Sequence, residues 1–183
     1  MITLYQFLAT GYEECEALGT TDICRRAGIK TILVSVTGNN IVESAHGVKI
    51  VADKLFEECD FSDADILMLP GGMPGATNLL AHDGLCKALT SHFEGGKMLA
   101  AICAAPLVLG NLGLLSGMKS TCYPGFEGEL IGATPTGALV EKDGQFITGK
   151  GPGAAYELGF TIVEHFYGKD VANALRKGMI CNE

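Results

Sequence analysis

Lys97-Met-Leu-Ala-Ala-Ile-Cys103-Ala-Ala-Pro106-Leu-Val-Leu109 joins an apolar run to a second apolar segment through a short turn. The run from Met98 to Ile102 predicts a buried parallel strand. Pro106 suits the first turn of a helix, because its missing N–H would have no partner there in any case. Small alanines before Pro106 allow a sharp strand-to-helix turn, with Cys103 at its start.

Cys103 is the first candidate functional residue. A cysteine at such a turn sits over a helix N-terminus, whose unsatisfied N–H groups and dipole favour a thiolate. Thiols in such places titrate well below the usual value of about 8.5, which makes them nucleophiles at neutral pH. This is the geometry of a nucleophile elbow, with cysteine in place of serine. A buried structural cysteine is the alternative that this segment leaves open.

Length and composition favour one compact α/β domain over residues 1–183. The chain is 48% hydrophobic and 19% charged, which is ordinary for a globular protein. Its formal net charge of −8 argues against nucleic acid or an anionic membrane as a partner. No apolar run approaches the roughly 20 residues that span a bilayer, and residues 2–8 predict a strand instead of a signal peptide.

The seven cysteines form no Cys-x-x-Cys pair and show no framework spacing. No histidine lies near a cysteine in the sequence at the spacing of metal ligands. Free thiols in a reducing compartment are the simpler interpretation. We therefore expect a cytoplasmic protein without a metal or other cofactor.

Apolar runs alternate with amphipathic segments along the chain, which indicates a mostly parallel sheet with helices on both faces. We expect strands at 2–8, 30–36, 65–69 and 98–102, hairpins at 41–51 and 140–147, and helices at 14–27, 76–81, 85–93, 106–112, 156–166 and 171–179. Sites in such sheets form beyond the carboxyl ends of the strands. Cys103 and two other turns lie there, which favours a functional role for this cysteine.

The first of these turns is Gly11-Tyr-Glu-Glu-Cys-Glu16, with three carboxylates at a helix start. Two of them are expected to complement the helix dipole only. The third would point into the site, where it tunes the thiol or carries protons. The second turn contains Gly71 and Gly72, which let the backbone approach a ligand closely. One of their N–H groups could form an oxyanion hole with that of Ala104, or the segment is a plain turn.

A third glycine-rich turn, Gly149-Lys-Gly151-Pro152-Gly153, is expected to wall or shape the pocket. The segment 144–151 nearly spells a phosphate-binding loop, but Gly151 replaces its hydroxyl residue and the preceding residues predict a hairpin strand. Ser116 and Lys119 match Ser-x-x-Lys without the partner motifs of that enzyme class. Neither match predicts an activity.

Together these segments resemble the ThiJ/PfpI superfamily, and within it the branch of the parkinsonism-associated deglycase and its bacterial relatives. The motifs that carry the resemblance occur in the family's order and cover nearly the whole chain: 11–16, 25–30, 69–72, 101–106, 141–144 and 151–153. The resemblance implies a flavodoxin-like three-layer sandwich, as in class I glutamine amidotransferases. It also implies a homodimer.

The family pattern places the reactive cysteine at Cys103 and the carboxyl group that contacts it at Glu16. It places the N–H groups of the oxyanion site at Gly72 and Ala104. The implied activity is that of a glyoxalase or deglycase acting on small reactive carbonyls, including glutathione-independent conversion of methylglyoxal to lactate. The alternative is a redox-sensing or chaperone-like stress protein that uses oxidation of Cys103.

One departure from the pattern concerns a histidine that several relatives carry within reach of the cysteine. Here Tyr123 takes that place, so a peptidase-type Cys–His pair has no evident base, with His82, His92 and His165 expected in surface helices. Tyr123 could still donate a hydrogen bond to substrate. His46 is expected to be exposed, or to reach a neighbouring site across a dimer. The roles of Cys15 and Cys122 stay open.

Overall fold

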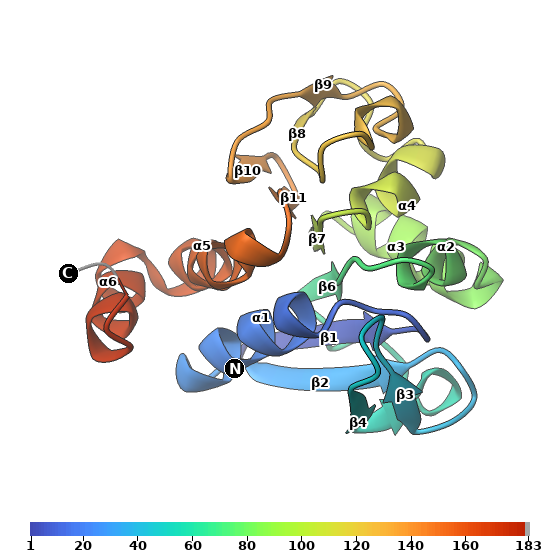
Figure 1. The fold of residues 1–183 in the computed structure, drawn as a ribbon. Helices are drawn as coiled ribbons and strands as arrows, with labels where there is room; N and C mark the ends of the chain where they lie inside the picture. Colours follow the sequence, from blue (N-terminus) through green and yellow to red (C-terminus); the bar gives the residue numbers. More distant parts are fainter. Residues whose placement is uncertain (182–183) are drawn as a thin grey trace.

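The computed structural model describes residues 1–181, and a seven-stranded sheet forms its centre (Figure 1). The strand order is β10-β11-β7-β6-β1-β2-β5, and every pairing is parallel except that of β10 with β11. The strands are β1 (Thr3–Leu8), β2 (Lys30–Ser35), β5 (Lys54–Leu55), β6 (Ile66–Leu69), β7 (Met98–Ile102), β10 (Val140–Asp143) and β11 (Phe146–Gly149).

The central strands are buried along their whole length, which explains their continuous apolar runs. Every residue of β1, β6, β7 and β11 is buried. Strands of a parallel sheet are covered by helices on both faces, so both sets of alternating side chains need apolar partners. The predicted parallel sheet is confirmed, and the two predicted hairpins are confirmed as well. The first hairpin pairs β3 (Ile41–Glu43) with β4 (Lys49–Val51) outside the main sheet.

The helices form two groups, one on each face of the sheet (Figure 1). One group holds α1 (Glu14–Arg26), α5 (Ala155–Tyr167) and α6 (Lys169–Gly178), and the other holds α2 (Gly75–Leu80), α3 (Asp83–Glu94) and α4 (Pro106–Asn111). Helices α1 and α5 pack closely because Gly159 lacks a side chain. A Cβ there would lie 2.9 Å from Cβ of Ile23. The predicted three-layer sandwich is therefore confirmed.

Short elements complete the fold and were not predicted. They are β8 (Lys119–Ser120), β9 (Thr134–Pro135) and the 3-10 turns η1 (Phe56–Glu58), η2 (Glu127–Glu129) and η3 (Pro152–Ala154). Each is too brief to show a hydrophobic period. Among residues 1–181, no helix combines the length and apolar character needed to cross a bilayer.

Candidate active site

Cys103 occupies the turn between β7 and α4, at the carboxyl edge of the sheet. Its φ of 64° lies in the left-handed region, which residues other than glycine rarely adopt. Two backbone hydrogen bonds hold this conformation. The Cys103 N–H donates to Gly149 O at 2.9 Å, and the Tyr123 N–H donates to Cys103 O at 2.8 Å. Pro106 occupies the first turn of α4, so the predicted sharp strand-to-helix turn at Cys103 is confirmed.

The turn after β6 lies directly against this elbow, because its glycines permit contact. A Cβ on Gly71 would lie 2.7 Å from Cβ of Cys103 and 2.8 Å from Oε2 of Glu16. Gly72 has a φ of 86°, and a Cβ there would lie 2.5 Å from the backbone nitrogen of Glu13. Glycine is thus required at both positions, because the Cys103 and Glu16 side chains approach Gly71 and the backbone before α1 approaches Gly72.

Glu16 comes from the first turn of α1 and is fully buried. Its Oε2 accepts the N–H of Gly71 at 2.8 Å, and its carboxyl group faces the Cys103 thiol. Its Oε1 has no partner with hydrogen-bond geometry among the described residues. The N–H groups of Gly72 and Ala104 also act on the Cys103 sulfur. The four residues that the family pattern brought together, Cys103, Glu16, Gly72 and Ala104, are therefore adjacent.

Burial dominates the ionisation of this pair. Loss of solvent raises the pKa of Glu16 to about 7, and the Glu13 charge adds to the rise. Contacts with Cys103 and with the Gly71 N–H oppose that rise. Burial and then the charge and hydrogen bonding of Glu16 raise the pKa of the Cys103 thiol to about 12.

The expected low pKa for this thiol is therefore wrong while Glu16 is ionised. A helix N-terminus does favour a thiolate, but a buried carboxylate in contact with the sulfur outweighs it. Three causes raise the pKa of the Cys103 thiol, and the two that come from Glu16 disappear when Glu16 carries the proton. The N–H groups of Gly72 and Ala104, which lower this pKa, remain. The two groups thus titrate as one unit that retains a single proton above about pH 7.

The raised pKa of Glu16 predicts how the stability of the protein depends on pH. A free glutamate titrates near 4.3, so between about 4 and 7 the folded chain holds a proton that the unfolded chain has lost. Folding stability therefore falls as pH rises through this window. The loss amounts to about 3 kcal/mol by pH 8, as an order of magnitude.

Urea unfolding of wild type and Glu16→Gln at pH 5 and pH 8 measures this effect. We expect wild type to lose stability relative to the glutamine variant between the two values. Burial lowers the pKa of His92 to about 4, which gives the opposite slope, but this contribution is common to both proteins and cancels. A stability difference that stays constant with pH would contradict the raised pKa of Glu16.

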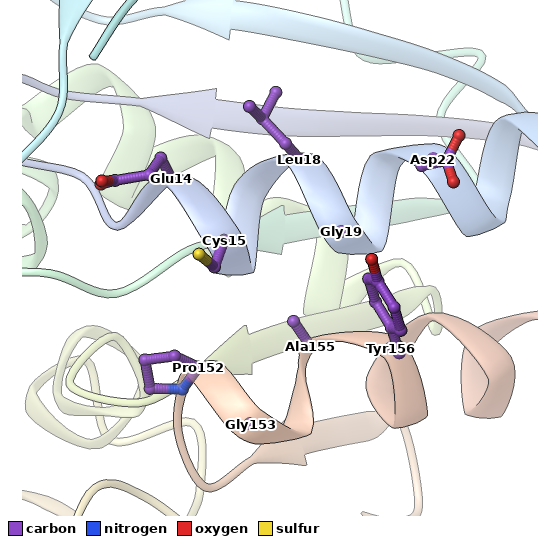
Figure 2. Close-up of a pocket in the computed structure, with 9 residues that line it drawn as sticks. All are labelled: Glu14, Cys15, Leu18, Gly19, Asp22, Pro152, Gly153, Ala155 and Tyr156. Atoms are coloured by element: carbon purple, nitrogen blue, oxygen red, sulfur yellow. The ribbon is translucent and has the colours of Figure 1, made fainter. Parts of the chain in front are cut away.

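The other predicted pocket residues do not all lie at one place. The ring of Tyr123 is half exposed and covers Gly151, where a Cβ would lie 3.2 Å from Cδ2 of Tyr123. Pro152 faces a different space, a groove of about 590 Å³ between α1 and the start of α5 (Figure 2). Cys15 lines this groove and is exposed, whereas neither Cys103 nor Glu16 lines it.

The histidines and the remaining cysteine near the site add no base. Glu16 is the titratable side chain whose charge and hydrogen bonding act on the Cys103 thiol. His46 is exposed as expected, and its Nδ1 lies 3.0 Å from Oε1 of Glu14. His92, expected on a surface, is instead buried in α3. Cys122 is buried, and burial raises its pKa to about 11.

The model of the DJ-1/PfpI family matches residues 3–165. The chain belongs to the DJ-1/PfpI family. It is similar to protein DJ-1 homolog B of Arabidopsis thaliana, with 41% identity over 90% of the chain, and spans only 38% of that longer relative. It is 30% identical to glutathione-independent glyoxalase DJR-1.2 of Caenorhabditis elegans, over 90% of the chain and 88% of that protein.

Solved structures of DJ-1 proteins agree with the fold. The oxidised structure of Toxoplasma gondii DJ-1 superposes with a TM-score of 0.96 at 32% identity, over the whole of both chains. The DJ-1/PfpI fold thus accounts for the strand order and for the elbow at its carboxyl edge.

One residue at this site was missed from sequence. Glu13 is buried and caps α1, with its Oε2 accepting the Glu16 N–H at 2.7 Å. The spacing Glu13-x-x-Glu16 is that of a capping box, in which the second side chain returns to the first N–H. Here that side chain turns to Gly71 instead, so the spacing alone could have identified the cap but not its place in the site.

Proposed function

We propose that this protein is a cysteine-dependent enzyme of the glyoxalase or deglycase type that acts on α-oxoaldehydes or their early adducts. The observation that carries the proposal is the buried Glu16–Cys103 pair, which holds one proton beneath the N–H groups of Gly72 and Ala104. This arrangement supplies a nucleophile, a proton carrier and two donors for a developing oxyanion.

With methylglyoxal, the Cys103 thiolate would add to the aldehyde carbon and give a hemithioacetal. The N–H groups of Gly72 and Ala104 stabilise the oxyanion until it takes the proton of Glu16. The Glu16 carboxylate, now ionised, removes the proton from the former aldehyde carbon and returns it to the neighbouring carbonyl carbon. The hydroxyl proton of the hemithioacetal passes to the former ketone oxygen, which leaves a lactoyl thioester on Cys103.

Water then cleaves the thioester, releases lactate and restores the thiol. The net reaction adds one water to methylglyoxal, because oxidation of one carbon balances reduction of its neighbour. No external oxidant or reductant takes part. The glyoxalase of Caenorhabditis elegans, at 30% identity, supports this reaction class.

Lactate formation from methylglyoxal, without added glutathione, tests this proposal. We expect wild-type protein to form lactate catalytically, with several turnovers per protein molecule. Absence of lactate above the protein-free control, from folded protein with a reduced Cys103, would overturn the proposed activity.

A redox-responsive stress protein is the second candidate function. A specific observation favours it, because Oε1 of Glu16 is buried without a hydrogen-bond partner among residues 1–181, and the Glu16 carboxyl group lies against the Cys103 thiol. A protonated Glu16 could donate to an oxygen of an oxidised sulfur. The oxidised structure of the Toxoplasma gondii relative is consistent with such chemistry in that protein. Mass spectrometry of peroxide-treated protein, combined with the lactate assay, separates the two functions.

We also propose that two copies associate through the face formed by α1, the β3–β4 hairpin and the start of α5. Large apolar side chains are exposed on all three elements: Val51 by 64%, Tyr156 by 50% and Leu18 by 39%. The elements are contiguous, since His46 meets Glu14 and the ring of Tyr156 packs on Gly19 (Figure 2). Apolar patches of this kind mark contact surfaces.

Sedimentation velocity of wild type and Tyr156→Lys tests this association. We expect a dimer for wild type and a monomer for the variant, because a charge would be buried at the contact. Lys87→Glu, a charge change on α3 of the opposite helix group, is the control and should leave the dimer intact. A monomeric wild type, or a variant that stays dimeric, would disprove the proposed face.

A further inference from the structure

A cavity of about 320 Å³ lies beside the turn that holds Cys103, apart from the groove between α1 and α5. Its wall includes the side chains of Met73, Leu107 and Phe126. Met73 follows the glycine turn directly, and Leu107 lies in the first turn of α4. The Phe126 N–H donates to Tyr123 O at 3.0 Å, and the Tyr123 N–H donates to Cys103 O. Three segments that contact the Cys103 turn therefore continue into the wall of this cavity.

Close packing fixes the far wall of the cavity. Helix α4 packs against both α2 and η2 (Figure 1). A Cβ on Gly110 of α4 would clash with the backbone oxygen of Glu129, so glycine permits this approach. The Asn111 Nδ2 donates to Leu107 O at 2.8 Å and to Oε2 of Glu129 at 3.1 Å. The Glu129 carboxylate thus has a defined position on the cavity wall.

The charge of this cavity selects its ligand. Among residues 1–181, Glu129 is the one charged residue in the cavity wall, and it forms no salt bridge. The other wall residues are apolar or neutral. A complementary ligand therefore combines an apolar chain with a terminal cation. Lysine and arginine side chains have this composition.

We propose that this cavity binds the carrier portion of the substrate, and that the preferred substrates are α-oxoaldehyde adducts on a chain that ends in a cation. An amino acid or peptide with a basic side chain is such a carrier. The adduct carbon meets Cys103, the chain lies along Met73 and Phe126, and the cation meets Glu129. This inference rests on the proposed function and narrows its substrate class, because a free oxoaldehyde has no chain to occupy the cavity.

Two reagents that alkylate Cys103 test this inference without any substrate turnover. N-(4-guanidinobutyl)chloroacetamide has a cation at the end of its chain, and N-pentylchloroacetamide has a neutral chain of similar length. Mass spectrometry of the peptide that contains Cys103 gives the alkylation rate for each reagent. The ratio of the cationic to the neutral rate cancels the intrinsic reactivity of the thiol. N-acetylcysteine gives the same ratio for a thiol outside any protein.

We expect the ratio for wild type to exceed that for N-acetylcysteine by roughly threefold, because Glu129 attracts the cation. Glu129→Gln should remove most of this preference, while its amide oxygen can still accept from Asn111. Glu127→Gln is the matched control. It removes the same charge from the same 3-10 turn, but Glu127 accepts the Gly125 N–H and does not line the cavity. This control should keep the wild-type ratio.

Met73→Ala tests the apolar part of the cavity. It should slow both chain-bearing reagents by roughly twofold relative to iodoacetamide, which has no chain, because apolar contact is lost. The ratio of the cationic to the neutral reagent should stay as in wild type. Unchanged rates of both reagents relative to iodoacetamide would place the chain outside this cavity and contradict the inference.

A wild-type ratio equal to that of N-acetylcysteine would overturn the inference. An equal fall in Glu129→Gln and Glu127→Gln would overturn it as well, because a general negative field would then replace a specific contact. The outcome is separate from that of the lactate assay. Lactate formation without a charge preference refutes the cavity alone, whereas a preference lost only in Glu129→Gln, without lactate formation, refutes the proposed activity alone.

Discussion

Cys103→Ala is expected to reduce lactate formation from methylglyoxal by roughly 10³-fold or more, to the level of the uncatalysed reaction. The sulfur is the only nucleophile that the buried pair offers, and the N–H groups of Gly72 and Ala104 are aimed at it. Without the sulfur no covalent adduct forms, so no substrate is bound where Glu16 can transfer its protons. Steady-state kinetics of lactate formation measure the loss.

The fold should tolerate this change. Alanine removes one atom from a side chain that is already 9% exposed, and the elbow is held by backbone hydrogen bonds that any residue can make. Cys86→Ser is the matched control, because Cys86 donates from α3 to Leu80 O and serine can do the same. Equal loss of activity in both variants would point to damage by cysteine replacement in general and not to nucleophilic catalysis.

Glu16→Gln is expected to lower turnover by roughly 10²-fold while Cys103 stays reactive. Glutamine retains an oxygen for the Gly71 N–H, so the glycine turn keeps its contact. It removes the charge and the acceptor that raise the pKa of the thiol, and it can donate to a thiolate. It cannot carry a proton between carbon atoms at neutral pH.

The measurement compares kcat for lactate formation with the rate of alkylation by iodoacetamide in the same variant. A large loss of kcat with little loss of alkylation identifies Glu16 as a proton carrier. A parallel loss of both would show that Glu16 acts only by tuning the thiol. Unchanged turnover would remove Glu16 from the chemistry altogether.

Sequence patterns were sufficient to predict the longer strands and helices, whose apolar residues form continuous runs or recur at regular spacing. The apolar run before Cys103 and the proline after it define a strand, a turn and a helix, and the structure contains all three. The convergence of three strand-end turns followed from the rule for parallel sheets. Gly71 and Gly72 could be identified because close backbone approach needs residues without side chains.

The ionisation of the site could not be predicted in the same way. A helix N-terminus suggested a low thiol pKa, but the burial of Glu16 and its contact with the sulfur are tertiary facts. Three carboxylates in the first turn of α1 looked alike in sequence. In the structure Glu16 contacts the thiol, Glu13 contacts the Glu16 N–H and Glu14 meets an exposed histidine. The family pattern had singled out Glu16, and the packing of α1 against the glycine turn gives Glu13 and Glu14 their separate contacts.

The most direct test of the account observes the adduct on Cys103. Glu16→Gln should accumulate it, because addition still occurs while the following proton transfer is slow. Carbon-13 NMR of this variant with methylglyoxal labelled at the aldehyde carbon is predicted to show a hemithioacetal carbon bonded to sulfur. The same signal should be missing when Cys103→Ala is added to Glu16→Gln. Identical spectra from the two proteins would contradict nucleophilic addition by Cys103.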